Sequence, residues 1–565
     1  MDIKLELSDF MYNAGIIGIM NILGYSGAGV SSEKNAIHFS SELLEKFSES
    51  YFGYMCEKYE NSTSWFGIVN HSLPDINQID EKKLEDLNKH IEFVKKTLQS
   101  NSYKNTYNLI KNAPYDIENL TLRLKKITKK KAETIKDVFP QINEAFDVLK
   151  NIVDYLKTPE AKKYIIARNV SYSIVQQFWE GVSFLHKKSN KKDMYEEFDN
   201  YFIVPIQKYL LEKQDEKKYS KYKYHCFTCE NKFSKLGSAY ELTWLNKTGV
   251  DPSRKSSHFW NYVSDAYICP LCNLVYACIP AGFTTVKGKG IFINQNESMD
   301  AIKTVNQFAL YKDPNIQSID DLEERSYFEI LDIVSHAKDA SAKKEIQNIQ
   351  IIKLNSSTDS KHNNQRPYTF NVLSKEKLNI IAQNKKQLSF LVGKFAKEGK
   401  DYIPIYQEVT KRLYNDQSQF DLIYRLFKLF LQKLFYELPA IKAIIIINTS
   451  SDKGGKETMY YKEINKFQNY GKKLRDSYVR GDKEGKISGI TYRLLNALKV
   501  NNAERFMDTF INAYMYQNDK IPYDFVQALQ EDRFRTIGYA FLLGLQGEVT
   551  KDNEEENKKE LSSNE

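Results

Sequence analysis

Charged and apolar residues alternate over residues 2–7, and this period of two predicts a short strand. The apolar run 10–23 follows, and Ser8 or Asp9 stands where the N-cap of a helix is expected. The run is too short to span a bilayer and contains two asparagines, so we expect a soluble protein without a membrane segment. The chain is thus predicted to begin with a strand followed by an apolar helix.

Helical spacing dominates the rest of the chain, and strand-like patterns interrupt it in a few places. The predicted elements are short strands at 36–39, 346–354 and 368–373, a hairpin at 285–294, and helices over 41–58, most of 80–212, 409–436, 439–448 and 459–546. The fold class that follows is α+β and predominantly helical.

Changes in composition divide the chain into five stretches. A Gly- and Lys-rich segment at 450–456 marks one boundary, and an acidic segment without apolar spacing ends the chain. We expect a mixed, mostly helical N-terminal domain at 1–220, a cysteine module at 221–283, an α+β continuation at 284–449, a helical bundle at 450–546 and a disordered tail at 547–565.

Four cysteines form two CxxC pairs, Cys226 with Cys229 and Cys269 with Cys272. Each pair brings two thiolates onto one tight turn, and two such turns complete a tetrahedral site with four cysteine ligands. This is the usual geometry of structural zinc, and four thiolates leave no open position for a substrate. The sequence therefore predicts a structural zinc site.

Details of this site stay open at the level of the sequence. We expect Pro270 to preset the second turn and Asn273 to take a left-handed conformation after it. His225 or His258 is an alternative ligand, and two unrelated pairs of buried thiols are the alternative to a metal site. The six cysteines do not resemble a disulfide framework, so we expect a reducing, cytoplasmic environment.

Signatures of several enzyme classes are missing. The sequence contains no GxxxxGK[ST] phosphate loop and no HExxH motif. A zinc-deaminase pattern fails because the His-x-Glu at His90 lies far upstream of the cysteines. We expect His90, and the pair His336 and Asp339, to lie on solvated helix faces. The sequence therefore predicts a protein that is not an enzyme.

Positive charge is concentrated locally. Lys and Arg exceed Asp and Glu by 81 to 73, a net charge of +8, so a nucleic-acid surface must come from clusters. One cluster, at 123–136, is predicted to lie within one helical stretch or a helix–turn, and the other, at 453–486, is interleaved with aromatic residues suited to stacking. A solvated helix face and a bundle core are the alternatives. The predicted nucleic-acid contacts in the clusters are Lys125, Lys126, Lys129, Lys130, Lys472, Lys473 and Arg475.

The paired CxxC turns and the opening Leu-x-x-Phe-Met-Tyr-Asn-Ala-Gly-Ile-Ile-Gly of residues 7–18 together resemble a known family. The chain is similar to the large subunit of the type I-B CRISPR interference complex (Cascade), in the branch with paired CXXC motifs. The likeness extends over the full length in layout, and its most specific part is the four cysteines.

This resemblance implies a non-catalytic subunit of a CRISPR RNA-guided DNA surveillance complex. Such a subunit recognises the motif that flanks the target, helps to open the duplex and recruits a separate helicase–nuclease, while guide pairing reads the target sequence. The implied partners are the CRISPR guide RNA, target double-stranded DNA, the backbone, 5′-handle-capping and small subunits of Cascade, and the helicase–nuclease. The C-terminal bundle would resemble the small subunit, with Met459 as a candidate internal start.

A glycine-bearing loop after the first helix becomes the candidate for flanking-motif contact. Glycines allow a backbone to approach a ligand closely, and polar side chains supply hydrogen-bond donors. An ordinary helix–strand connection is the alternative. The predicted contacts are Asn21, Ser26, Gly27, Gly29, Lys34 and Asn35.

Two other functions compete with this interpretation. One is a zinc-dependent nucleic-acid enzyme that acts alone, and the other is a zinc-ribbon adaptor that binds only protein.

Overall fold

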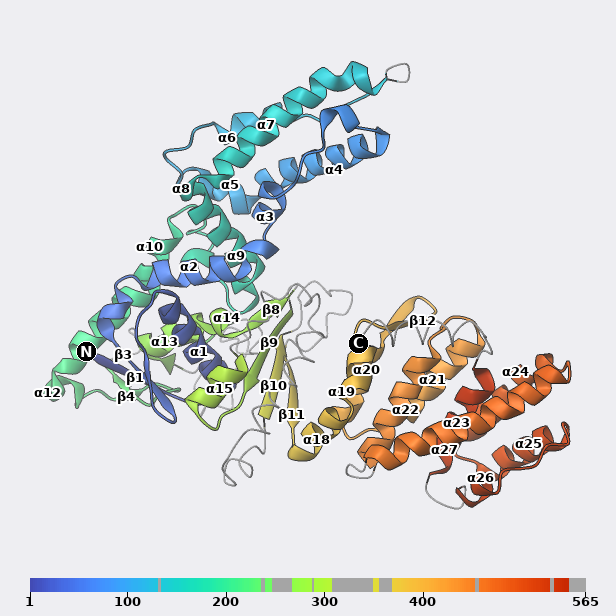
Figure 1. Cartoon of the computed structure of the whole chain (residues 1–565). Coiled ribbons are helices and arrows are strands. Elements are labelled where there is room, and N and C mark those ends of the chain that lie inside the picture. The colour runs from blue at the N-terminus through green and yellow to red at the C-terminus, as the bar shows by residue number, and fades with distance from the viewer. Residues whose placement is uncertain are drawn as a thin grey trace. The chain divides into compact units, whose positions relative to one another are not determined.

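A computed structural model gives the fold and describes residues 1–130, 134–234, 239–245, 267–286, 289–306, 349–354, 368–452, 457–528 and 533–547. These residues form a predominantly helical α+β protein (Figure 1), which confirms the predicted fold class. None of the described helices is long and apolar enough to cross a membrane. The predicted tail from 548 onward, His258 and His336 lie outside the described residues.

The chain divides into two compact units. Unit one lies within 1–319 and 350–370, and unit two lies within 320–349 and 371–565. The predicted boundary at 450–456 falls inside unit two, where α22 (Leu438–Asp452) packs against α23 (Glu457–Arg480) and α27 (Phe534–Gln546). Whether the five predicted stretches fold independently stays a prediction.

Unit one begins with a small antiparallel sheet in the order β1-β3-β2. β1 (Asp2–Glu6) pairs with β3 (Ala36–Ser40), and β2 (Ser31–Ser32) pairs with the other edge of β3. The alternation seen in the sequence buries Ile3 and Leu5 and exposes the charged residues between them.

α1 (Phe10–Tyr25) follows this strand and is the central helix of the unit. The Asp9 carboxylate caps it by accepting hydrogen bonds from the backbone N–H groups of Met11 and Tyr12, as the sequence predicted. Its residues are buried on all sides between Tyr12 and Met20, which explains why the run is apolar throughout.

The other helices of unit one build a mostly helical body around α1. The predicted helix at 41–58 is divided into a 3₁₀ turn, Ser41–Leu44, and α2 (Phe47–Tyr59). The remaining helices are α3 (Ser64–Val69), α4 (Glu81–Leu98), α5 (Asn101–Tyr107), α6 (Ile117–Arg123), α7 (Phe139–Lys157), α8 (Pro159–Ala161), α9 (Ala167–Ser173), α10 (Met194–Phe198), α11 (Val204–Gln214) and α12 (Glu216–Tyr219). Two π-helical turns, η5 (Lys162–Ile166) and η8 (Asp199–Ile203), precede α9 and α11.

A second sheet has the strand order β11-β10-β9-β8. β8 (Thr284–Val286) and β9 (Lys289–Asn294) form the predicted hairpin, and β10 (Ile349–Leu354) pairs antiparallel with β9. β11 (Tyr368–Leu373) matches its predicted bounds. α1 and α15 (Met299–Asn306) both contact β9, so its apolar residues are fully buried.

Unit two is a helical assembly with one two-stranded hairpin, β12 (Phe395–Glu398) and β13 (Asp401–Pro404). Its closest helix pair is α23 with α27. A Cβ atom on Gly471 would lie 2.1 Å from the Phe541 carbonyl oxygen, so these backbones can touch only through glycine. The other helices among the described residues of this unit are α18 (Lys375–Gln383), α19 (Lys385–Leu391), α20 (Ile405–Tyr414), α21 (Phe420–Leu431), α24 (Ile487–Lys499), α25 (Ala503–Met515) and α26 (Tyr523–Ala528).

Candidate metal centre

The first CxxC turn closes a short β-hairpin. Cys226 follows β4 (Tyr224–His225), and the chain returns through β5 (Lys232–Phe233). The N–H of Glu230 donates to the Cys226 carbonyl at 2.9 Å. Glu230 has a φ of 59°, so the left-handed residue of the site follows the first pair of cysteines.

The second CxxC turn is the start of a helix. It follows β7 (Tyr267–Ile268), which pairs with β6 (Tyr240–Glu241), and Cys269 is the N-cap of α13 (Pro270–Ala277). Pro270 occupies the first helical turn, where its fixed φ is favourable. The prediction of a left-handed Asn273 is wrong: because Cys269 caps the helix, Asn273 lies within it and is fully buried.

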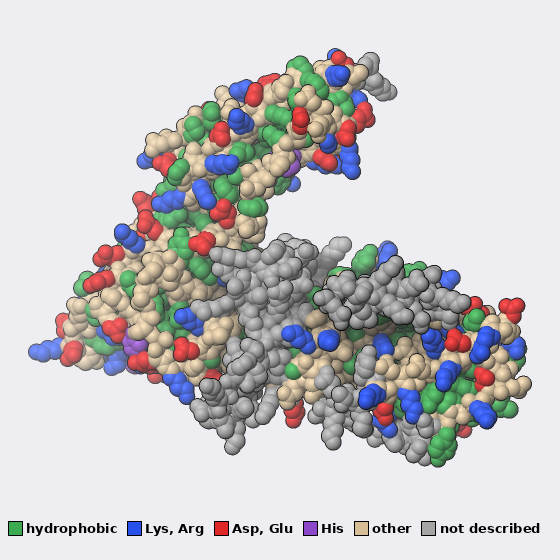
Figure 2. All heavy atoms as spheres, viewed as in Figure 1, with side chains coloured by type: hydrophobic (Ala, Val, Ile, Leu, Met, Phe, Trp, Pro, Cys, Tyr) green, Lys and Arg blue, Asp and Glu red, His purple; other side chains and the backbone are tan. Residues whose placement is uncertain are grey.

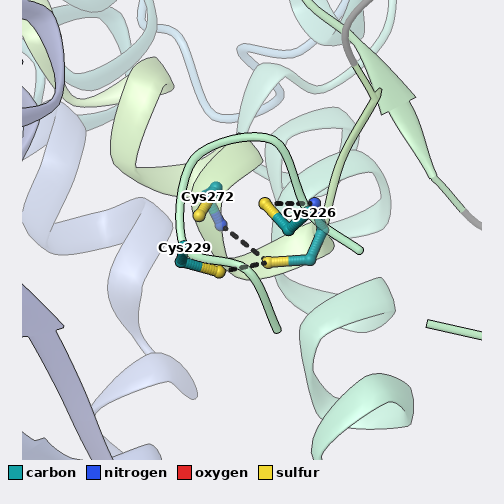
Figure 3. Close-up of side chains that lie close together, drawn as sticks. Cys226, Cys229 and Cys272 are labelled. Atoms are coloured by element: carbon teal, nitrogen blue, oxygen red, sulfur yellow. Dashed lines mark hydrogen bonds between the residues drawn. The ribbon is translucent and has the colours of Figure 1, made fainter. Parts of the chain in front are cut away.

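The two turns bring four sulfur atoms together from opposite sides (Figure 3). All four Sγ atoms lie within 4.8 Å of one another, and those of Cys229 and Cys269 are 3.7 Å apart. A regular tetrahedron with Zn–S bonds of about 2.3 Å has sulfur atoms about 3.8 Å apart. All six cysteines are free thiols, so the four form neither disulfides nor two unrelated pairs. The geometry is that of a four-cysteine metal site.

The histidine alternatives gain no support. His225 is exposed on β4 and is not part of the sulfur cluster, and His258 lies outside the part of the chain that the structure describes.

Each sulfur atom has its own hydrogen-bonding group. The N–H of Cys269 donates to Cys226 Sγ at 3.3 Å, and the N–H of Cys272 donates to Cys269 Sγ at 3.5 Å. Asn231 Nδ2 donates to Cys229 Sγ at 3.1 Å, and the Tyr12 hydroxyl lies 3.6 Å from Cys272 Sγ. Donors of this kind orient the ligands of a metal and stabilise their negative charge.

The negative charge of four ionised thiols in this buried site would need a compensating cation. Hydrogen bonds from neighbouring thiols, Cys229 first, lower the pKa of Cys226, whereas burial raises the pKa of Cys272. The four thiols thus cannot all ionise by themselves, and a bound metal ion would supply the compensating charge. Because Cys226, Cys269 and Cys272 are at most 1% exposed, the site has the closed character of a structural centre.

α1, the first helix of the chain, packs directly against the segment that contains the metal site. A Cβ atom on Gly15 would lie 2.2 Å from the Val275 carbonyl oxygen, and one on Gly18 would lie 2.0 Å from that of Cys278. From the other side, a Cβ atom on Gly282 in α14 (Ile279–Gly282) would lie 1.9 Å from the Ala14 carbonyl oxygen. Residues 7–18 and the cysteine turns, which carried the family resemblance, therefore pack as one unit.

Carbonyl groups after the second turn are held by side chains from distant parts of unit one. The Ala277 carbonyl accepts from Trp179 Nε1 at 3.2 Å and from the Tyr51 hydroxyl at 3.3 Å. The Ala281 carbonyl accepts from Asn21 Nδ2 at 3.1 Å and from the Tyr54 hydroxyl at 3.3 Å. The ends of short helices leave carbonyls without backbone donors, and these side chains fill that need.

A third carbonyl, that of Phe283, is held in the same way. It accepts from Lys58 Nζ at 2.9 Å and from the Tyr59 hydroxyl at 3.3 Å. The three carbonyls thus anchor the metal module to α1, α2 and Trp179.

Predictions for the loop after α1 have a mixed outcome. The loop is exposed from Gly24 onward, with Gly27 at a φ of +73° and open space around Gly27 and Gly29. Ser26, Lys34 and Asn35 are on this exposed stretch. Asn21 is not: its amide belongs to α1 and is used on the Ala281 carbonyl, a structural role that the sequence did not show.

The first basic cluster does not lie on one continuous helix: Arg123 ends α6, and Lys136 lies in a 3₁₀ turn, Ile135–Val138. Residues 124–130 have no regular secondary structure. Lys126 forms an ion pair with Glu92 at 2.9 Å, and Lys129 forms one with Glu81. Two of the four predicted phosphate contacts, Lys125, Lys126, Lys129 and Lys130, are thus partly neutralised by carboxylates on α4.

The second cluster divides into core and surface. Phe467 and Tyr478 are buried in the core of unit two, so these two rings are not available for stacking on a nucleic acid. Lys472 and Lys473 are exposed on α23, while Arg475 is mostly buried and lies 3.6 Å from Glu484. On the face shown in Figure 2, Lys and Arg side chains are interspersed with Asp and Glu over both units.

His90 is also placed differently from the prediction. Its ring stacks on that of His71, with centroids 3.5 Å apart and planes inclined by 12°. His90, on α4, is therefore partly buried against the ring of His71 rather than on a freely solvated face.

Comparison with known proteins supports one part of the chain directly. Residues 219–284 match the model of a family described as CRISPR-associated protein (Cas_CXXC_CXXC). The matched segment contains both CxxC turns, α13 and α14. No curated protein matches the chain, and no solved structure matches it either. The segment 219–284 is therefore similar to a CRISPR-associated family.

Proposed function

We propose that the chain is the non-catalytic large subunit of a type I-B CRISPR RNA-guided DNA surveillance complex. In this role it recognises the motif that flanks the target, helps to open the duplex and recruits a separate helicase–nuclease. Its partners are the guide RNA, the target duplex and the other subunits of the complex.

The observation that carries this proposal is the union of two distant sequence motifs in one packed module. The segment with the CxxC turns matches a CRISPR-associated family, and α1, which contains most of the motif at 7–18, contacts Val275 and Cys278 of that segment through Gly15 and Gly18. We take the metal to be zinc, because four thiolates in tetrahedral arrangement favour it. A buried four-sulfur site with no open position supports a scaffold rather than a catalyst.

Co-purification tests the proposal. The tagged chain, expressed with the neighbouring genes of its CRISPR locus, is expected to bring down a guide RNA with a repeat-derived 5′ end. Isolation of the assembled complex without RNA would favour the protein-binding adaptor. Metal-dependent cleavage of nucleic acid by the isolated chain would favour the stand-alone enzyme.

The loop after α1 is the proposed contact to the flanking motif. Ser26 and Lys34 are replaced together by alanine, and binding to targets with a panel of flanking motifs is compared with that of the unmodified complex. We expect a changed preference, because base-edge contacts specify sequence. Asn21→Ala is made separately, since loss of its bond to Ala281 affects packing; an unchanged preference in the double variant would exclude the loop.

Met459 lies in α23, whose partners include α22. If a small subunit is also made from this position, replacing Met459 by leucine removes that fragment without changing the full chain. A fragment that persists, or that never occurs, rejects the internal start.

A further inference from the structure

Residues 186–192 form a tight loop that carries four lysines and no acidic residue. The loop leads from a 3₁₀ turn, Ser183–Leu185, toward α10. Successive turns fix its backbone: the N–H of Ser189 donates to the His186 carbonyl at 2.9 Å, and that of Lys192 donates to the Ser189 carbonyl at 3.1 Å. We name residues 186–192 the basic loop.

Its lysines differ in their surroundings. Lys192 pairs with Glu197 at 2.8 Å, and the Ser189 hydroxyl donates to the same carboxylate at 2.6 Å. Lys187, Lys188 and Lys191 are exposed and form no ion pair with any residue that the structure describes. Three ammonium groups of this loop are therefore exposed without an ion-pair partner among the described residues.

Two further carboxylates follow the loop: Glu196 is exposed, and Asp193 is held by hydrogen bonds from neutral groups. Asp193 Oδ1 accepts from the Tyr195 N–H at 2.8 Å, and Asp193 Oδ2 accepts from the Tyr164 hydroxyl at 2.9 Å. Beside them, Lys163 of η5 lies exposed with its ammonium 4.4 Å from the centre of the Tyr195 ring, and adds a further positive charge.

A buried arginine lies beneath the basic loop. Arg168, on α9, is 0% exposed, and its Nη2 donates to the Lys192 carbonyl at 3.2 Å. Its Nε and Nη1 groups have no hydrogen-bond partner among the described residues. Burial lowers the pKa of Arg168, yet a guanidinium stays charged at physiological pH. Tyr172 and the charge of Asp193 compensate part of the cost of this burial, and a negative ligand above the loop would add to that compensation.

We propose that the basic loop binds the phosphate backbone of nucleic acid, with Lys187, Lys188 and Lys191 on phosphate oxygens and Arg168 holding the loop from below. The proposal rests on the proposed function, because that function supplies the polyanion. Duplex DNA carries one charge per about 1.7 Å of its axis, so several lysines on one short loop can engage neighbouring phosphates. The contact is independent of sequence, unlike that proposed for the loop after α1.

A charge-matched pair of variants tests the proposal in the full-length chain. The loop variant is K187Q/K188Q/K191Q. The control variant is K104Q/K150Q/K157Q, which removes three exposed lysines of unit one that form no ion pair with described residues. Fluorescence anisotropy with a labelled duplex of about 30 base pairs, and separately with one of its strands, is recorded from about 50 to 200 mM KCl, the range over which counterion release is readily measured.

We expect the loop variant to lower the slope of log affinity against log salt by about 2 to 3, and the affinity at about 100 mM KCl by about tenfold or more, on duplexes of any sequence. The control variant is expected to keep the slope within about 0.5 of the unmodified chain, because non-contacting charges add little to counterion release. The comparison of duplex with single strand shows which form of the backbone the loop prefers.

Equal slopes for the loop and control variants would overturn the basic loop while leaving the proposed function, which is judged by guide RNA, in place. Failure of the unmodified chain to bind either probe at the lowest salt concentration would overturn it as well. If the loop variant binds nucleic acid normally but loses an acidic protein from the purified complex, the loop belongs to that partner and the proposal is wrong.

Discussion

Both units contain a helix pair whose backbones meet through glycines, but the two pairs are stabilised in different ways. In unit one, α1 meets α14 at Gly18 and Gly282; in unit two, α23 meets α27 at Gly471 and Gly544. α14 has four residues and α13 has eight, whereas α23 has 24 and α27 has 13. Helices as short as α13 and α14 are not stable alone, so their position depends on the metal site and on donors to their carbonyls.

The longer pair needs no such help. Leu474 on α23 and Phe541 on α27 are both buried, and contact between the long apolar faces of this unit's helices supplies the stability. Close approach of helices through glycine is thus common to both units. The helix pair is stabilised by the metal site and carbonyl donors in unit one, and by apolar packing in unit two.

Removal of the metal is expected to have the largest effect, and only on unit one. Chelation, or the double change Cys226→Ser and Cys272→Ser, removes metal binding worth about 10–16 kcal/mol in structural zinc sites. Hydrogen exchange in α13 and α14 should lose its protection while exchange in α23 and α27 stays slow. Cys56→Ser, outside the sulfur cluster, is the control. Equal loss of protection in both units would contradict the comparison.

Alanine at the glycine contacts should destabilise each unit by a similar amount. A Cβ atom on Gly18 would lie 2.0 Å from the Cys278 carbonyl oxygen, and one on Gly544 would lie 1.8 Å from that of Gln468. Backbone atoms cannot rotate away, so we expect each change to cost about 3 kcal/mol. Gly24→Ala, at the end of α1 with open space around it, is the matched control and should be neutral or mildly stabilising. The free energy of unfolding in denaturant is measured for all three variants. If Gly18→Ala costs little, the close backbone contact at Gly18 is wrong.

Two buried tyrosines allow a finer comparison of carbonyl donors. The Tyr478 hydroxyl donates to the Ala513 carbonyl at 3.0 Å in unit two, whereas the Ala277 carbonyl in unit one has Trp179 besides Tyr51. Tyr478→Phe should cost about 1.5 kcal/mol, because a carbonyl in the last turn of α25 loses its donor. Tyr51→Phe should cost about 0.5 kcal/mol, since Trp179 still satisfies Ala277. If denaturant unfolding shows that Tyr51→Phe is the more destabilising change, Trp179 and Tyr51 do not share the Ala277 carbonyl.

The smallest expected effect is a pH dependence confined to unit one. Burial lowers the pKa of His71, and burial together with His71 lowers the pKa of His90 to about 4. An unfolded histidine has a pKa of about 6.5, so the unfolded chain binds more protons and the stability of unit one falls as pH decreases from about 6.5 to 4.

The part of unit two at 371–565 provides the internal control for this dependence, because it contains no histidine. His90→Gln should flatten the decline for α3 and α4, as followed by hydrogen exchange at several pH values. If the protection of α3 and α4 declines equally with falling pH in the variant, groups other than His90 cause the pH dependence.

Features of short range were predicted well from the sequence. The Asp9 cap, the hairpin of β8 and β9 and the bounds of β11 depend on neighbouring residues. The two CxxC turns are of the same kind, because each pair of thiolates is placed by its own tight turn. Only the approach of the two turns to each other depends on the fold, and the spacing of the four cysteines predicted that approach.

Features that join distant residues were missed or misread. Asn21 was selected as a nucleic-acid contact, yet its partner Ala281 lies 260 positions away. Lys126 was selected from a run of positive charge, yet it forms an ion pair with Glu92 on α4. No local pattern distinguishes a solvated side chain from one that meets a partner across the fold.

The amino-acid sequence alone specifies the four metal ligands, the apolar helix beside them and the predominantly helical class, because thiol chemistry and residue periodicity act over a few positions. Folding in three dimensions decides which face of that helix touches the ligands, which basic residues stay unpaired and where Arg168 lies beneath the basic loop. These properties depend on burial and on charges brought from elsewhere in the chain, and such neighbours exist only after the chain has folded.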